Sequence, residues 1–154
     1  MQPLQNNEAL IELLTQPQNP FYAILFGCLF TAIVQSSSVT TGLAIIFTQQ
    51  GLLGLENAVP LIMGANLGTT ATAFIAVFTM DIAAKKTALS HFLFNLGGVI
   101  IFIPILFAFS GRLSEFDSQP AIALANIHLI FNVVTSLVFI LLITPFTKFV
   151  DMIL

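Results

Sequence analysis

Charged residues are scarce in this chain, and tryptophan is absent. Only 7% of the 154 residues are Asp, Glu, Lys or Arg, against roughly 25% in an average soluble domain, whereas 57% are hydrophobic. Four basic residues cannot form the clustered Lys and Arg that nucleic-acid binding requires, which excludes that function. The lone cysteine, Cys28, excludes an intrachain disulfide, and its apolar neighbours indicate a small packing residue. The composition therefore predicts an integral membrane protein.

The start of the chain lacks the basic region and unbroken apolar core of a signal peptide. We expect residues 1–20 to form an interfacial segment instead, with a short helix over residues 8–14 at the membrane surface. Residues 21–154 are expected to form a single transmembrane domain of the all-α class.

Three apolar segments are long enough to cross a bilayer, which takes about 20 helical residues. They are residues 58–80, 89–109 and 121–144. The last two are conventional spans, and Pro145 is expected to help end the final one. The first contains residues 64–70 (GANLGTT), whose glycines and polar side chains predict a broken helix.

A polar block interrupts the apolar sequence before these spans. It reads Gln35-Ser36-Ser37-Ser38-Val39-Thr40-Thr41, and its flanks carry no charge. The preceding segment, 21–34, reaches only about 21 Å as a helix, short of a full crossing. Two arrangements fit: one continuous helix with the block at its midpoint, or a re-entrant helical hairpin over residues 21–48 with the block at its tip. We favour the hairpin, because Ser, Thr and Val are poor helix formers.

Both polar segments allow two interpretations. A helix break in the membrane frees N–H groups that bind anions and carbonyl oxygens that bind cations. Alternatively, the hydroxyls only bond to neighbouring helices or to their own carbonyls, and the G-x-x-x-G spacing within 64–70 only packs helices. Two such segments at similar depth favour a shared central site.

A His-x-x-Phe-Asn pattern occurs twice, at residues 91–95 and 128–132, and places His and Asn on one helix face. Two histidines do not complete a metal site, so we expect them to support helix packing around the site. The expected hydrocarbon segments contain no charged residue, which argues against a carboxylate proton relay. An anion would need amides, hydroxyls, helix dipoles and a cation bound beside it, so its binding should be coupled to a cation.

The basic residues bear on orientation. With a hairpin at the start, Lys85, Lys86 and Lys148 share one side of the membrane, and Arg112 lies on the other. The positive-inside rule then favours a cytoplasmic C-terminus and a hairpin that enters from outside. A first segment that spans the membrane would instead put the N-terminus on the side of the lysines.

The joint pattern resembles the type II sodium–phosphate cotransporter family. The resemblance rests on the polar block, on 62–70 (IMGANLGTT), on 85–95 (KKTALSHFLFN) and on 125–132 (ANIHLIFN), in that order. Members of this family look like two-repeat transporters, with a Gln-Ser-Ser-Ser hairpin in each repeat and phosphate and sodium bound between them. This chain has one such motif and resembles the C-terminal repeat, so it supplies half of an inverted-repeat site. It is then a fragment, a chain that pairs with an inverted copy of itself, or one that joins a separate repeat.

The resemblance implies a multi-pass half-transporter in the cell membrane that moves inorganic phosphate with sodium as the coupling ion. It implies no other cofactor and no enzymatic activity. The expected partners are phosphate, sodium, the lipid bilayer, and a second copy in a homodimer or a partner repeat. The rival interpretation is a non-transporting scaffold subunit whose polar motifs only pack helices. A serine hydrolase is disfavoured because the membrane segments offer no acidic residue for a triad.

The resemblance also implies roles for particular residues. Those expected to bind phosphate or sodium are Gln35, Ser36, Ser37, Ser38, Thr40, Asn66, Gly68, Thr69 and Thr70. Among them, the expected sodium ligands are Ser37, Ser38, Asn66 and Thr69. The expected supporting residues are His91, Asn95, His128 and Asn132.

Overall fold

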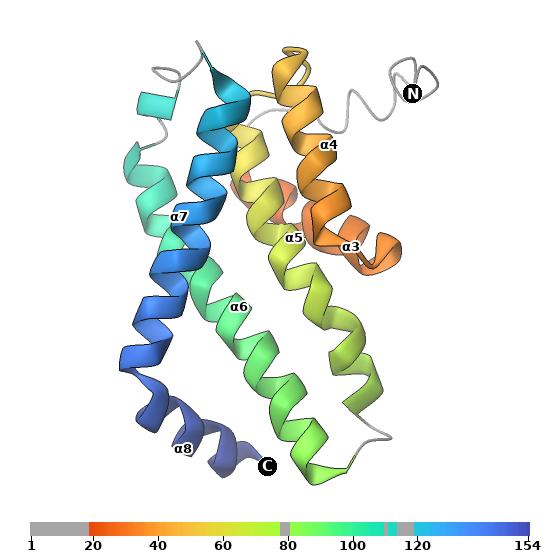
Figure 1. Ribbon diagram of the computed structural model, residues 1–154, viewed down its shortest axis with the longest axis vertical. Coiled ribbons are helices and arrows are strands. Elements are labelled where there is room, and N and C mark those ends of the chain that lie inside the picture. The colour runs from red at the N-terminus through yellow and green to blue at the C-terminus, as the bar shows by residue number, and fades with distance from the viewer. Residues whose placement is uncertain (1–18, 78–80, 110, 114–118) are drawn as a thin grey trace.

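The computed structural model describes residues 19–77, 81–109, 111–113 and 119–154, and all of its elements there are helical. The main helices are α3 (Pro20–Val34), α4 (Ser37–Gln49), α5 (Leu55–Ala76), α6 (Ile82–Phe109), α7 (Pro120–Leu141) and α8 (Ile143–Ile153). In Figure 1, α4 to α7 run along the long axis, and α8 turns across the lower end. The expected all-α class is confirmed for the described part, whereas the interfacial helix expected over 8–14 lies outside it.

Two helices, α6 and α7, are long and apolar enough to cross a membrane. In each helix, only 17% of an apolar stretch of 18 residues is buried inside the protein. A core helix of a soluble protein would be mostly buried. Their apolar side chains therefore face outward, as lipid contact requires. The exposed apolar side chains on these two helices include Ile100, Phe107, Leu129, Leu137 and Ile140.

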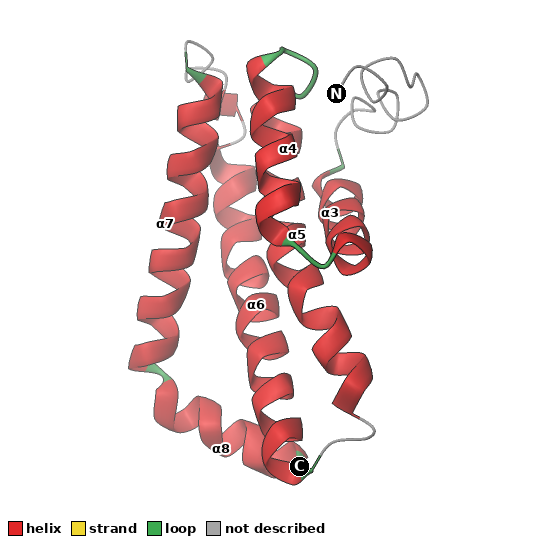
Figure 2. Ribbon diagram, turned by 45° about the vertical axis from the view of Figure 1, so that its right-hand side comes forward, coloured by secondary structure: helices red, strands yellow, loops and turns green. Residues whose placement is uncertain are grey.

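The polar block does not lie inside a continuous helix. The first helix ends at Val34 and the next begins at Ser37, so the chain turns at Gln35 and Ser36. Both views place this turn midway along the bundle rather than at either end (Figures 1 and 2). In the same views α3 is inclined and lies across α5, so the two arms of the turn are not parallel neighbours.

The expectation that the segment 58–80 is broken at residues 64–70 is wrong. This segment belongs to α5, which is one continuous helix from Leu55 to Ala76. The hydroxyls of Thr69 and Thr70 donate to backbone carbonyls three residues earlier in the same helix, so they add to its internal bonding. Gly64 and Gly68 also lie within the continuous helix, and both pack against α3.

The glycines of α5 let the backbones of α3 and α5 approach each other closely. A Cβ atom on Gly64 would overlap the backbone carbonyl of Ile24, and one on Gly68 would overlap that of Cys28. From the other side, Gly27 of α3 packs against the backbone of α5. Small residues at this spacing allow such close contact between helices in lipid. The G-x-x-x-G sequence therefore fixes the position of α3 on α5.

The two apolar spans pack against each other in opposite directions. Gly98 of α6 lies against Thr135 of α7. One turn further along α6, the ring of Phe102 lies edge-on to Phe131 of α7, with centroids 4.8 Å apart. Because later residues of α6 meet earlier residues of α7, the two helices are antiparallel.

The structure adds a helix that the sequence did not predict. The last span, expected to reach residue 144, ends at Leu141, and α8 follows directly from Ile143 to Ile153. Pro145 lies in the first turn of α8, where its missing N–H costs no helical hydrogen bond. The proline thus begins a second helix instead of only ending the first.

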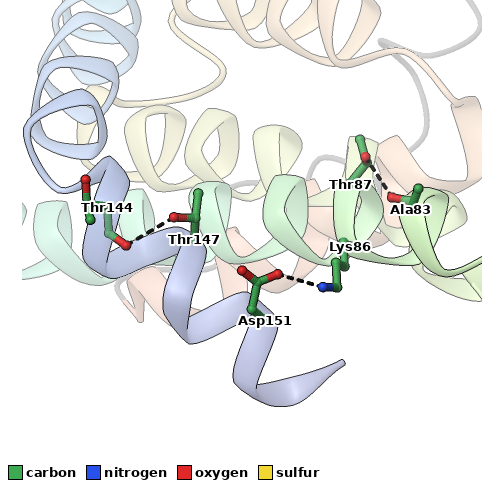
Figure 3. Close-up of polar contacts among 6 residues, drawn as sticks. All are labelled: Ala83, Lys86, Thr87, Thr144, Thr147 and Asp151. Carbon is green, nitrogen blue, oxygen red and sulfur yellow. Dashed lines mark hydrogen bonds and ion pairs between the residues drawn. The ribbon is translucent and has the colours of Figure 1, made fainter.

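Two contacts hold α8 against the bundle. The rings of Phe139 on α7 and Phe146 on α8 pack edge to face, with centroids 5.0 Å apart. At the start of α6, Lys86 Nζ donates to Asp151 Oδ1 of α8 at 2.7 Å (Figure 3). Both charged side chains are partly exposed, so this ion pair stabilises the contact by only about 0–1 kcal/mol.

We predict that Gly64→Ala destabilises the protein by about 1–3 kcal/mol, because the added methyl group forces the backbones of α3 and α5 apart. Gly42→Ala in α4 is the matched control, since a Cβ there meets nothing within 4 Å. Helix propensity alone should leave that variant neutral or stabilise it by up to about 1 kcal/mol. Thermal unfolding in detergent compares the two, and equal stabilities would contradict the close contact.

Candidate functional site

Gln35 and Ser36 build the turn between α3 and α4. Gln35 ends α3 in the left-handed conformation (φ 61°, ψ 25°), and its backbone N–H donates to the carbonyl of Thr31 at 2.7 Å. Its side-chain Nε2 donates to the carbonyl of Ala32. Ser36 is extended and is the N-cap of α4, where its Oγ accepts from the N–H of Val39 at 3.4 Å. The first two residues of the polar block thus reverse the chain.

This turn brings two helix ends of opposite polarity together. The last carbonyl groups of α3 form the negative end of the α3 dipole, and the first N–H groups of α4 form the positive end of the α4 dipole. The N–H groups of Ser37 and Ser38 belong to the first turn of α4, which has no earlier helical carbonyl to bond. The turn therefore offers donors for an anion and acceptors for a cation within a few residues.

The polar side chains of the turn are exposed or half-buried. Gln35 and Ser38 are exposed, and Ser36 and Ser37 are half-buried. The four residues of the Gln-Ser-Ser-Ser motif thus form one accessible tip, which the protein covers only in part.

A buried hydrogen bond joins the two helices behind the tip. Thr31 Oγ1 and Thr40 Oγ1 are 2.7 Å apart, and both residues are almost completely buried, at 0% and 2% exposure. Thr40 Oγ1 also lies 3.3 Å from the carbonyl of Ser36. Thr40, expected at the site, thus lies behind the turn and links α3 to α4. Sequence reasoning missed Thr31, although it lies one helical turn before Gln35.

The polar segment of α5 lies next to this pair. A Cβ on Gly68 would come within 2.8 Å of the Thr31 side chain, so Gly68 lies against the base of the turn. Thr69 Oγ1 donates to the carbonyl of Asn66 at 2.6 Å, and Thr69 is half-buried. Thr70 is fully buried and donates within its own helix. The structure therefore joins the two polar segments through Gly68 and Thr31.

Three buried polar atoms of the described residues have no hydrogen-bond partner: Thr41 Oγ1 of α4, Asn66 Nδ2 of α5 and Thr135 Oγ1 of α7. Leaving such a group unpaired costs about 1–3 kcal/mol, and native structures contain few of them. Asn66 is among the expected site residues, and Thr41 belongs to the polar block but has no assigned role, whereas Thr135 is not expected at the site. Thr135 follows Asn132 by one turn on the same face of α7, which is the signal that could have found it.

The two His-x-x-Phe-Asn patterns make the same local contact. Asn95 Nδ2 donates to the carbonyl of His91 at 3.3 Å, and Asn132 Nδ2 donates to that of His128 at 2.8 Å. Because α6 and α7 are antiparallel, the two histidines lie on opposite sides of the Phe102 contact, roughly 20 Å apart along the helices at 1.5 Å per residue. The structure does not bring them together, and the described residues hold no cluster of metal-ligating side chains.

These features define a helical membrane protein with a polar helix break beside its apolar spans. The chain belongs to the Na+/Pi-cotransporter family, whose model matches residues 4–117. The resemblance inferred from the sequence motifs is thereby confirmed, and the family is one of transporters rather than enzymes.

Relatives of known name support this assignment. The chain is 38% identical over 132 residues to the uncharacterised protein YqeW of Bacillus subtilis, covering 86% of this chain and 43% of that one. It is 36% identical over 135 residues to rat sodium-dependent phosphate transport protein 2B, covering 84% of this chain and 19% of that one. For mouse sodium-dependent phosphate transport protein 2C, identity is 41% over 92 residues, with 56% and 15% covered. The chain thus spans less than half of each relative, and no solved structure matches it.

We predict a coupling free energy of about 0.5–1.5 kcal/mol between Thr31 and Thr40 in a double-mutant cycle of Thr31→Val and Thr40→Val. Thr40→Val leaves the buried Thr31 hydroxyl without this partner, and Thr31→Val leaves the Thr40 hydroxyl with only the carbonyl of Ser36. The double change removes both hydroxyls. Thr48→Val is the control, because among the described residues Thr48 Oγ1 bonds to the carbonyl of Ala44 in its own helix, at 2.7 Å. Its effect should add to that of Thr31→Val, as unfolding by denaturant would show. Additive effects for Thr31 and Thr40 would contradict the link.

Proposed function

We propose that this chain is a half-transporter that moves inorganic phosphate together with sodium across a cell membrane. In this proposal the α3–α4 turn enters the bilayer as a re-entrant hairpin, and the protein is multi-pass. The main support is the turn itself, because it presents polar groups midway along a bundle with an apolar outer surface. Groups at such depth persist where they face a substrate path or a partner. The cargo is inferred from the names of the rat and mouse relatives.

The start of α4 suits phosphate. The N–H groups of Ser37 and Ser38 lie at the positive end of the helix dipole, and both side chains add hydroxyl donors. Each hydrogen bond to a charged ligand contributes about 1.5–3 kcal/mol. Since the described residues of this region include no Lys or Arg, a bound cation would have to balance much of the phosphate charge.

The end of α3 suits that cation. Carbonyl groups at the C-terminal end of a broken helix coordinate sodium in other transporters. The side-chain nitrogen of Gln35 is bonded to Ala32, so its side-chain oxygen is available as a further ligand. Ser37, Ser38, Asn66 and Thr69 complete the proposed oxygen set. In this arrangement the remaining site and supporting residues hold the helices in place, and they are Ser36, Thr40, Gly68, Thr70, His91, Asn95, His128 and Asn132.

A partner would supply the other half of the site. The side chains of Gln35 and Ser38 at the tip are exposed. A second copy of this chain, inverted relative to the first, or a separate repeat would bring an equivalent tip against them. Sodium is then the coupling ion. The positive-inside rule favours the cytoplasm for the end of the bundle that carries Lys85, Lys86 and Lys148.

A second candidate is a non-transporting scaffold subunit. Two observations favour it: Gly64 and Gly68 pack against α3, and the hydroxyls of Thr69 and Thr70 bond within their own helix. The exposed tip and the unpaired Nδ2 of Asn66 favour the transporter instead, because helix packing explains neither of these features.

Ser37→Ala should lower sodium-driven phosphate uptake about tenfold or more, since it removes a hydrogen bond to a charged ligand. Gln35→Ala should lower uptake by a similar factor, because it removes a proposed oxygen ligand of the sodium ion. Thr87→Ala is the matched control, because that exposed hydroxyl bonds to its own helix at Ala83 O and lies far from the tip. Radiolabelled phosphate uptake into proteoliposomes measures all three. If Ser37→Ala and Gln35→Ala both transport normally, the proposal is wrong.

Phosphate should raise the thermal unfolding temperature of the purified protein only when sodium is present, because the cation offsets the charge of the anion. Potassium chloride at equal ionic strength is the control. A scaffold subunit would show no shift with either salt. The same measurement on Ser37→Ala should show the shift reduced.

A further inference from the structure

The C-terminal helix α8 has three distinct sides. At 100° per residue, its polar side chains share one edge, and these are Thr144, Thr147, Lys148 and Asp151. Val150, 3% exposed, faces the bundle together with Phe146. The third side is apolar but unburied, with Phe149 at 47%, Met152 at 76% and Ile153 at 48% exposure.

The exposed apolar side continues the lipid-facing surface of the last span. Ile140 and Leu141 at the end of α7 are 65% and 83% exposed, and Leu142 and Ile143 follow at 50% and 54%. Since α7 is apolar enough to cross a membrane, lipid that covers its outer surface also reaches α8. No polar residue separates the two surfaces at the bend.

The charges of α8 place it at the edge of the hydrocarbon. The partly exposed ion pair of Lys86 and Asp151 ties α8 to the start of α6 (Figure 3). Lys85 belongs to the same first turn of α6. Lys148 is exposed on the polar edge one turn before Asp151. An amphipathic helix with lysine on its polar edge and bulky apolar residues beside it lies in the membrane interface. The lysine ammonium groups then meet the phosphates of anionic lipids.

We propose that α8 is an interfacial helix that inserts Phe149, Met152 and Ile153 into the leaflet at the α6 start and binds anionic lipid headgroups through Lys148. The inference rests on α8 and its surroundings, and it holds whether or not the tip of the hairpin binds phosphate. The occupant of the exposed side is lipid, because the lipid-facing surface of α7 runs directly into it.

The absence of tryptophan from the chain allows a direct test. Single variants Phe149→Trp and Thr147→Trp are reconstituted, as the full chain, into phosphatidylcholine vesicles that contain phosphatidylglycerol. Tryptophan at 149 should emit at a shorter wavelength than tryptophan at 147. Its fluorescence should be quenched by lipids brominated near the headgroup and only weakly by iodide. Tryptophan at 147, on the polar edge, should be quenched by iodide several-fold more strongly. Met152→Trp repeats the test at the most exposed of these positions, where packing is not disturbed.

The outcomes separate the possible environments of this side. Equal iodide quenching at 147, 149 and 152 would place α8 in water and overturn the proposal. Shielding of 149 and 152 from both quenchers would mean that protein covers this side, and would overturn it as well. For the headgroup contact, bromolipid quenching at 149 should weaken when phosphatidylglycerol is omitted, and Lys148→Gln should remove that difference. A difference that persists in Lys148→Gln would exclude Lys148 as the contact.

Discussion

The backbone contact between α3 and α5 is the constraint on which the rest of the structure depends. Gly27, Gly64 and Gly68 are the residues that permit it, since any larger side chain at these positions would meet main-chain atoms. The contact holds α3 across the bundle and so determines where α3 ends. The reversal at Gln35 and the start of α4 follow from that position, and the tip lies midway along the bundle as a result.

The hydrogen bonding around the tip shows how a helix break is tolerated in an apolar protein. Gln35 takes a left-handed conformation that costs most residues about 1–2 kcal/mol, and its backbone and side-chain N–H groups both bond to α3. Ser36 caps α4, and the Thr31–Thr40 bond joins the two helices in the buried layer behind. The inner side of the break is thus bonded within the chain, while its outer side keeps polar groups free for other contacts.

The sequence predicted the helix break but not the packing around it. The break at Gln35 and Ser36 was predictable because polar residues interrupt an apolar segment too short to cross a membrane. The continuity of α5 was not, because Gly64 and Gly68 weaken a helix or pack it according to the neighbour they meet, and the sequence does not show that neighbour. The Thr31–Thr40 bond depends on how two helices are rotated toward each other. The sequence does not show α8, because a proline after an apolar span fits the end of one helix as well as the first turn of the next.

The exposed apolar surfaces of α6 and α7 have a consequence for assembly. In a bilayer, lipid solvates such surfaces about as well as another protein does, so they give two chains no reason to associate. A partner can lower the free energy of the chain chiefly at the tip, where it can form hydrogen bonds with the exposed polar side chains of Gln35 and Ser38. If a second copy supplies the other half of the proposed site, the association of the two chains and the completion of that site are one event.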